Sequence, residues 1–231
     1  MMKLGLETDL ETLNEIFQPW SPKKRIEKLY EYFNEEDIFY TSSFGANSVC
    51  LLKLISEVRP SQDVHFLNTT FHFSETLAYK RLLTEELGLN VIDIFPDPTQ
   101  NALTHKEETW KDDPDLCCMV NKIVPIDAVK VNFRLWISGL IGFQTHFRSA
   151  LNIFDMSQGM IKFNPLIDQT ALQIEAYKQE NDLPLHPMVK QNYHSIGCTH
   201  CTIKGKGRNG RWQGQAKTEC GLHLDNDKKT K

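Results

Sequence analysis

Short apolar runs alternate with longer segments of helical periodicity along the first part of the chain. The runs at 38–40, 64–67 and 91–95 predict three strands, because each is short, apolar and bounded by turn-forming residues. A helix is predicted over 22–34, where a Ser-Pro pair supplies the cap and the first helical residue. This alternation predicts an α/β fold with a doubly wound, mostly parallel sheet covered by helices on both faces.

Two further helices are predicted between these strands. The first covers 49–55, and the second begins with Ser74 as its cap, turns Leu77, Leu82 and Leu83 inward and ends at Gly88. Farther along, the pattern predicts one strand and one helix, over 135–138 and about 169–179.

The chain changes character after Gly197. From 198 to 218 it has no carboxylate, four glycines, three lysines and two arginines. We therefore expect a flexible C-terminal tail, with disorder over 225–231.

The loop after the first predicted strand is rich in small residues. In an open parallel sheet, ligands bind at the carboxyl ends of strands, and backbone amides at a helix start favour an anion. Ser42, Ser43, Gly45 and Ser48 suit that task, because small side chains let amides and hydroxyls approach a phosphate closely. An ordinary serine-rich turn is the alternative.

Composition narrows the class of protein. At 231 residues with a net charge of -4, the chain fits one sizeable domain, and its overall charge disfavours nucleic-acid binding. We expect neither a signal peptide nor a membrane helix, and a cytoplasmic location. In a reducing compartment, clustered cysteines are typically ligands or catalysts.

Four of the six cysteines form two close pairs. Cys117 and Cys118 are adjacent, and Cys198 and Cys201 form a CxxC pair, so together they supply the four thiolates of a [4Fe-4S] cluster or a structural zinc site. Buried cysteines acting as small hydrophobic residues are the alternative, and we expect this role for Cys50 in its apolar helix.

Cys220 stands apart from these pairs in a polar segment that we expect to be exposed. A lone cytosolic thiol is a candidate nucleophile when nearby cations lower its pKa. Arg208 and Arg211 on the same segment also suit bidentate binding of a compact anion. A zinc-ribbon-like nucleic-acid patch and a solvated loop are the alternatives for this basic stretch.

An ordered set of motifs resembles the assimilatory adenylyl-sulfate reductases. The similarity extends from about Ser42, with Ser42-Ser43-Phe44-Gly45 resembling a modified pyrophosphate-binding loop, to His223. The further motifs are Cys117-Cys118 with Lys122 and Pro125, Trp136-Ile137-Ser138-Gly139-Leu140, Asn164-Pro165-Leu166, Ser195-Ile196-Gly197-Cys198-Thr199-His200-Cys201-Thr202, Arg208-Asn209-Gly210-Arg211-Trp212 and Glu219-Cys220-Gly221-Leu222-His223.

The resemblance implies an adenine nucleotide alpha hydrolase-like fold that reduces adenosine 5'-phosphosulfate to sulfite and AMP. By this analogy Cys220 attacks the sulfur to form an enzyme thiosulfonate, and thioredoxin or glutaredoxin releases sulfite. The four paired cysteines would bind a [4Fe-4S] cluster. The implied substrate-binding residues are Ser42, Ser43, Phe44, Gly45, Lys122, Arg148, Arg208, Arg211 and His223.

The resemblance also implies a division of the chain. Residues 1–36 form an N-terminal helical segment, 37–197 a nucleotide-binding α/β domain, and 198–231 a cluster-binding and catalytic tail of the same domain. We expect no nucleic-acid or membrane partner, and homo-oligomerisation is compatible with the sequence.

Departures from the family pattern bear on the substrate. Asn121 stands where the family usually has Arg, and Ile141 to Phe143 stand where it has charged residues, so we expect less charge near the pocket. The alternatives are therefore reduction of 3'-phosphoadenosine 5'-phosphosulfate, or of both nucleotides. An ATP-dependent sulfur transferase of the same superfamily is a further alternative, disfavoured because the loop lacks the usual second Gly and Asp.

Overall fold

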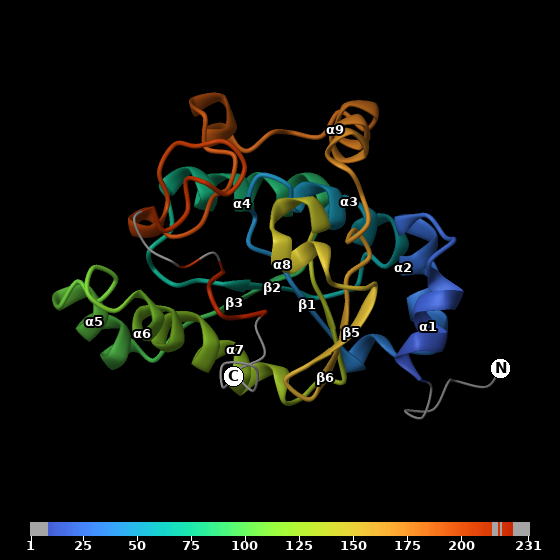
Figure 1. Cartoon of the computed structure of the whole chain (residues 1–231), viewed down its shortest axis with the longest axis horizontal. Coiled ribbons are helices and arrows are strands. Elements are labelled where there is room, and N and C mark those ends of the chain that lie inside the picture. The colour runs from blue at the N-terminus through green and yellow to red at the C-terminus, as the bar shows by residue number, and fades with distance from the viewer. Residues whose placement is uncertain (1–8, 214–216, 218, 224–231) are drawn as a thin grey trace.

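The computed structural model describes residues 9–213, 217 and 219–223, and the predicted disorder over 225–231 falls outside them. Within the described residues a six-stranded sheet crosses the molecule (Figure 1). All neighbouring strands are parallel except the last pair, β5 and β6. The order is β3-β2-β1-β4-β6-β5, with β1 Ile38–Thr41, β2 Val64–Leu67, β3 Val91–Ile94, β4 Leu135–Ile137, β5 Phe154–Ser157 and β6 Met160–Phe163. The predicted α/β class and mostly parallel sheet are confirmed.

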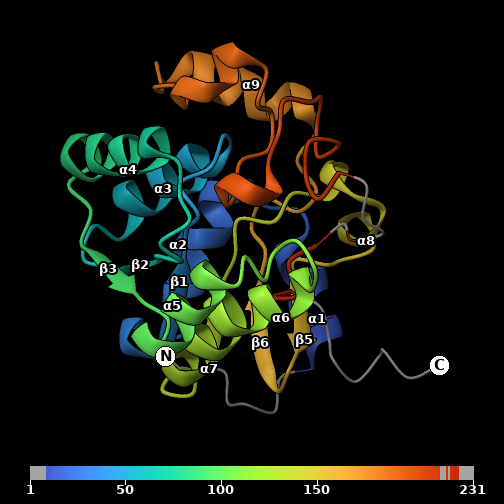
Figure 2. The same ribbon diagram turned by 90° about the vertical axis from the view of Figure 1, so that its left-hand side faces the viewer.

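Helices cover both faces of the sheet, as predicted. α3 (Ser48–Val58) and α4 (Ser74–Leu87) lie on one face, and α5 (Pro98–Lys106), α6 (Pro114–Cys118) and α7 (Val124–Lys130) on the other (Figures 1 and 2). A π-helical segment, Met119–Ile123, joins α6 to α7. The remaining α-helices among the described residues are α1 Leu10–Phe17, α2 Pro22–Tyr32, α8 His146–Ser149 and α9 Ala171–Glu180.

The order of the strands fixes where a ligand can bind. From β1 the chain moves outward to β2 and β3, then crosses to the other side of β1 to form β4. Loops after β1 and β4 therefore diverge and leave a crevice at the carboxyl ends of these strands, the usual ligand site of open α/β sheets. The serine-rich loop after Thr41 borders this crevice.

A buried arginine ties the N-terminal helices to the sheet. Arg25 in α2 is only 1% exposed, and its guanidinium donates two hydrogen bonds to the Asp168 carboxylate, at 2.7 and 2.6 Å. It also donates to the carbonyl oxygens of Phe17, Gln18 and Pro165, at 3.1, 2.9 and 3.1 Å. One side chain thus connects the end of α1, the start of α2 and the loop after β6.

Some local predictions were wrong. Ser74 is the first residue of α4 rather than its cap, because Phe73 has the extended backbone of the cap and the Ser74 hydroxyl donates to Glu75 instead. Leu83 is buried, but Leu82 is 40% exposed, since adjacent helical residues point in different directions. Cys50 lies in the core, as predicted.

The hairpin of β5 and β6 was not predicted. Its turn is Gln158-Gly159, and both residues have positive φ angles, of 52° and 74°. A two-residue turn of this kind matches the twist of paired strands, and its second residue, a glycine, adopts the left-handed conformation without strain. The hairpin adds the one antiparallel edge strand to the sheet described here.

Buried His186 makes stability depend on pH. Its side chain is fully buried, with Nε2 3.1 Å from Thr76 Oγ1 and Nδ1 accepting a hydrogen bond from the Met188 amide at 3.2 Å. Burial lowers the pKa of His186 to about 4, so the unfolded chain takes up a proton first as the pH falls below about 6.5. We expect this group to remove about 2 kcal/mol of the free energy of unfolding between pH 7 and pH 5.

Denaturant unfolding at both pH values tests this expectation. His186→Gln should have a smaller pH dependence than the wild type, whereas substitution of exposed His194 should leave the dependence unchanged. Equal pH dependence in wild type and His186→Gln would contradict the assignment.

Candidate active site

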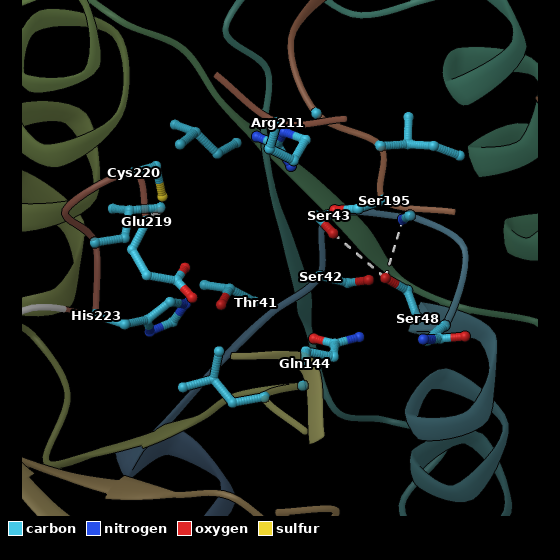
Figure 3. A pocket seen from close by; sticks show the side chains of 18 of the residues that line it. Thr41, Ser42, Ser43, Ser48, Gln144, Ser195, Arg211, Glu219, Cys220 and His223 are labelled. Carbon is cyan, nitrogen blue, oxygen red and sulfur yellow. Dashed lines mark hydrogen bonds between the residues drawn. The ribbon is translucent and has the colours of Figure 1, made fainter. Parts of the chain in front are cut away.

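One cavity occupies the crevice at the carboxyl ends of β1, β2 and β4. The loop after β1 forms one side, and the C-terminal segment, which contributes lining residues between His194 and His223, forms the other (Figure 3). Eleven of the residues predicted from the sequence line it: Ser42, Ser43, Gly45, Ser48, Lys122, Arg148, Cys198, Arg208, Arg211, Cys220 and His223. Phe44, Cys117, Cys118 and Cys201 are outside the lining.

The loop after β1 is a compact turn stabilised by serine hydroxyls. Ser42 Oγ accepts a hydrogen bond from the Phe44 amide at 3.2 Å, and Ser48 Oγ accepts one from the Gly45 amide at 3.0 Å. Ser43 Oγ lies 3.4 Å from Ser48 Oγ (Figure 3). Phe44 has a positive φ of 47° and buries its ring against Phe66. Its contribution to the loop is therefore a core anchor, while the hydroxyls around it face the cavity.

Arg211 packs between a glycine and a tryptophan. Its guanidinium carbon lies 4.4 Å from the centre of the Trp212 ring, and its Nε donates to the Cys201 carbonyl at 3.3 Å. A Cβ atom on Gly197 would lie 2.2 Å from Arg211 Nη2. The absence of a side chain at position 197 is thus what allows the guanidinium to lie in the cavity wall.

Gly197→Ala is expected to weaken nucleotide binding by about tenfold or more, because the new methyl group displaces the Arg211 guanidinium and a hydrogen bond to a charged group is lost. The free energy of unfolding should change little, since the clashing atoms end a flexible side chain. Isothermal titration with nucleotide and denaturant unfolding measure the two effects.

Gly139→Ala is the matched control for this substitution. Gly139 lines the same cavity, but a Cβ there would meet only Leu51, at an ordinary 3.8 Å. Equal nucleotide affinity in the Gly197→Ala variant and the wild type would rule out a binding role for Arg211 in this position.

Two of the predicted substrate-binding arginines pair with a carboxylate of the protein itself. Arg148 donates to both oxygens of Glu219, from Nε at 2.8 Å and from Nη2 at 2.9 Å. Arg208 Nη2 donates to Glu219 Oε2 at 3.0 Å. Glu219 was not predicted as a site residue, although its position next to Cys220 could have indicated it.

The environment of Cys220 also differs from the expectation of an exposed tail. The residue is half-buried and lines the cavity, beside Glu219 and His223 and across from the serine loop (Figure 3). Burial holds the pKa of His223 well below 6.5, and the charges of Lys162, Arg148 and Arg208 lower it further. The His223 ring is therefore neutral at pH 7.

The four paired cysteines come from two distant segments. Cys117 and Cys118 end α6. Cys198 precedes a single helical turn, and Cys201 ends it. The Thr199 amide donates a hydrogen bond to the Phe71 carbonyl at 2.8 Å, which ties this turn to the loop after β2. Three polar groups approach the sulfur atoms: Lys122 Nζ lies 3.7 Å from Cys118 Sγ, Asn121 Nδ2 3.7 Å from Cys117 Sγ and Thr69 Oγ1 3.5 Å from Cys198 Sγ.

The charges of these cysteines and of Lys122 shift one another's pKa values. Burial raises the pKa of Cys117 to about 11, with smaller contributions from Cys118 and Cys198. Burial also acts to raise the pKa of Cys198, but Lys122, Thr69 and Arg211 outweigh it and leave that pKa below its usual value. Buried Lys122 keeps its proton because nearby thiolates, Cys198 foremost, raise its pKa. The buried ammonium therefore favours the thiolate of Cys198, whereas burial outweighs its effect on Cys118 and leaves that pKa above its usual value.

This donor set fits an iron–sulfur cluster. Among the described side chains, no group of three or more His, Cys, Asp or Glu residues is placed to hold a metal ion. A [4Fe-4S] cluster makes a different demand, because each of its four irons takes one thiolate. The chain supplies that number of cysteines, three of them buried, with N–H donors beside two of the sulfurs.

Comparison with known proteins identifies the family. Residues 37–204 match the phosphoadenosine phosphosulfate reductase domain. The chain belongs to this family. The family resemblance predicted from the motifs is confirmed, and the match covers both the serine loop and the CxxC pair.

The similar proteins are named as reductases of two different nucleotides. The chain is 39% identical to an adenosine 5'-phosphosulfate reductase of Bacillus cereus, over 84% of the chain and 86% of the relative. It is 35% identical to a phosphoadenosine 5'-phosphosulfate reductase of Gloeobacter violaceus, over 94% of each. A crystal structure of the phosphoadenylyl-sulfate reductase from Candida auris, a phosphate complex, is similar with a TM-score of 0.74 and 25% identity, covering 87% of this chain and 99% of that one.

The positions that depart from the family pattern lie outside the cavity lining. Ile141 and Gly142 are buried, Phe143 is 50% exposed, and none of the three belongs to the cavity lining. Asn121 instead bonds Asn101, Thr104 and the Cys117 carbonyl in a buried network. The cavity of this phosphoadenosine phosphosulfate reductase domain retains four cations, Lys122, Arg148, Arg208 and Arg211.

Proposed function

We propose that this enzyme reduces the sulfate of adenosine 5'-phosphosulfate to sulfite and releases AMP, as a step of sulfate assimilation. The observation that carries the proposal is the position of Cys220, which lines one cavity together with the serine loop and four cationic side chains. The names of the relatives support the reductase activity. The reaction steps below are those that the family resemblance implies.

In the first step, the Cys220 thiolate attacks the sulfur atom of the nucleotide. A bond forms between Cys220 Sγ and the sulfate sulfur, and the bond from that sulfur to the bridging phosphate oxygen breaks. AMP leaves with the electron pair, and the enzyme carries a thiosulfonate on Cys220. Cations near the reacting groups are needed, because negative charge develops on the phosphate while a thiolate approaches a negatively charged sulfuryl group.

In the second step, a dithiol protein of the thioredoxin or glutaredoxin class supplies two electrons. One of its thiolates attacks Cys220 Sγ, and sulfite leaves with the electrons of the S–S bond. The resulting mixed disulfide is resolved by the second thiol of the partner, which regenerates the Cys220 thiol. A reducing cytoplasm suits a cycle that ends on a free thiol.

The remaining cavity residues bind and orient the nucleotide in this proposal. The loop of Ser42, Ser43 and Gly45 contacts the phosphate, because its small residues let amide and hydroxyl groups approach closely. Arg211 and Lys122 neutralise the anionic phosphosulfate. Neutral His223 offers a ring nitrogen as a hydrogen-bond donor near Cys220.

We also propose that Cys117, Cys118, Cys198 and Cys201 hold a [4Fe-4S] cluster. When bound, the cluster would supply a structural and electrostatic centre beside the cavity, and the thiol chemistry does not require it to accept electrons. Lys122 connects the two regions, because it lies 3.7 Å from Cys118 Sγ and also lines the cavity.

The experiment is sulfite release by anaerobically purified enzyme with thioredoxin, from adenosine 5'-phosphosulfate and from its 3'-phosphorylated form in parallel. Iron and sulfide analysis of the same preparation tests the cluster. Faster release from the unphosphorylated nucleotide supports the proposal, and faster release from the other form assigns the alternative substrate. No sulfite from either nucleotide by iron-replete enzyme would refute the proposed reaction.

A further inference from the structure

Glu219 is the one acidic side chain in the cavity lining described here, and it comes directly before the nucleophile candidate. Its side chain is only 3% exposed. Besides three hydrogen bonds from Arg148 and Arg208, it accepts one from the Thr145 hydroxyl at 3.3 Å. A carboxylate with this many charged and neutral donors is fixed in one orientation.

The three charged groups depend on one another. A buried carboxylate without partners costs several kcal/mol, and two buried guanidinium groups side by side repel each other. Burial and, after it, the Arg148 charge lower the pKa of Arg208 to about 10, while Glu219 acts in the opposite direction. Glu219 is thus the group that allows Arg148 and Arg208 to lie close together in the wall of the cavity.

The residues after Cys220 are anchored as well. Gly221 has a φ of 93°, and a Cβ there would lie 3.0 Å from Ile123 Cδ1, so the backbone lies directly against the π-helical segment. Leu222 packs on the cluster of Phe39, Ile126 and Trp136. Cys220 is therefore held between an ionic contact on one side and an apolar contact on the other.

We propose that Glu219 is a positioning residue, which binds Arg148 and Arg208 in order to hold Cys220 at the cavity. On this assignment the two arginines act on the reaction through the C-terminal segment, and Arg211 and Lys122 are the cations that contact the anionic nucleotide. This inference rests on the proposed function and changes the role that the sequence analysis expected for Arg148 and Arg208.

Single-turnover formation of the Cys220 thiosulfonate tests the assignment. Glu219→Gln should slow this step by roughly ten- to a hundredfold, the scale of loss expected when a reacting group is misplaced. Nucleotide affinity, measured by titration of adenosine 5'-phosphosulfate in a Cys220→Ser background, should stay within about twofold, well under the tenfold that one lost contact of about 1.4 kcal/mol represents. Alkylation of Cys220 by iodoacetamide should become faster, and Glu219→Asp should recover part of the rate.

Asp115→Asn is the matched control, because it removes a different ionic contact of the C-terminal segment, between Lys217 and an Asp115 side chain that is 70% exposed. We expect no change in rate or alkylation.

A double-mutant cycle distinguishes whether Arg148 acts through Glu219 or contacts the nucleotide directly. If Arg148 acts through Glu219, the double variant Glu219→Gln with Arg148→Gln should be no slower than the slower single variant.

The outcomes are distinct. Wild-type enzyme that forms no thiosulfonate would refute the proposed function itself. Active wild type with an unchanged rate and alkylation in Glu219→Gln would overturn the positioning role. Multiplied rate losses in the double variant, or weakened nucleotide affinity in Glu219→Gln, would overturn it in favour of direct contacts with substrate.

Discussion

Replacing Cys220 by serine is expected to reduce sulfite release by roughly 10⁴-fold or more, because the proposed reaction forms its covalent intermediate on this sulfur. A serine hydroxyl is a much weaker nucleophile at neutral pH, and the thiosulfonate requires a sulfur–sulfur bond. Cys198, the other cysteine in the described lining, is buried and belongs to the proposed ligand set. It is not placed to replace Cys220.

Mass spectrometry of the enzyme after a single turnover measures this prediction. Wild type should carry the added sulfonate on the peptide that contains Cys220, and the serine variant should carry none while still binding nucleotide. Cys50→Ala is the control, since Cys50 is buried in α3 and should leave the adduct unchanged. An adduct of normal yield on another residue of Cys220→Ser would contradict the assignment of the nucleophile.

Replacing Arg25 by methionine is expected to lower the free energy of unfolding by about 3 kcal/mol, the lower end of the range for breaking a buried ion pair. The substitution removes the charged donors from the carbonyls of Phe17, Gln18 and Pro165. Asp168 is partly exposed and can regain water, which is why we expect the lower end. Denaturant unfolding measures the change.

An exposed lysine on the same helix provides the control. Lys23 forms a solvent-exposed ion pair with Glu57, and such pairs contribute little, so Lys23→Met should change stability by less than about 1 kcal/mol. Similar losses in the two variants would mean that the Arg25 contacts do not stabilise the fold as described.

Strong local patterns made much of the fold predictable. The strands at β1, β2 and β3 are short apolar runs between turn signals, and each lies within a residue of its expected position. The β5–β6 hairpin was missed because Phe154–Ser157 contains only two apolar residues, and its pairing depends on backbone conformation at Gln158 and Gly159. Pattern alone does not specify such a turn.

The site was predictable as a set of residues but not as a set of contacts. Spaced motifs indicated that Cys220, Arg208 and Arg148 belong to one site, and the cavity brings them together. Their sequence separation gives no distance, so the ion pairs with Glu219 were not foreseeable. Asn121 and Ile141 to Phe143 lie outside the cavity lining, which was not foreseeable because a position in a motif does not say which way a side chain points.

The π-helical segment Met119–Ile123 has a consequence for how this chain can vary. A π-turn accommodates one residue more than an α-turn, and Pro125 favours it here because its nitrogen cannot donate to the preceding turn. Deleting one residue would restore a regular α-helix with the flanking turns in register, but the side chains within the segment would lose the directions that the π-turn gives them. Lys122 would then turn away from either the sulfur atoms or the cavity. Substitutions can therefore be tolerated in this stretch where a change of length cannot.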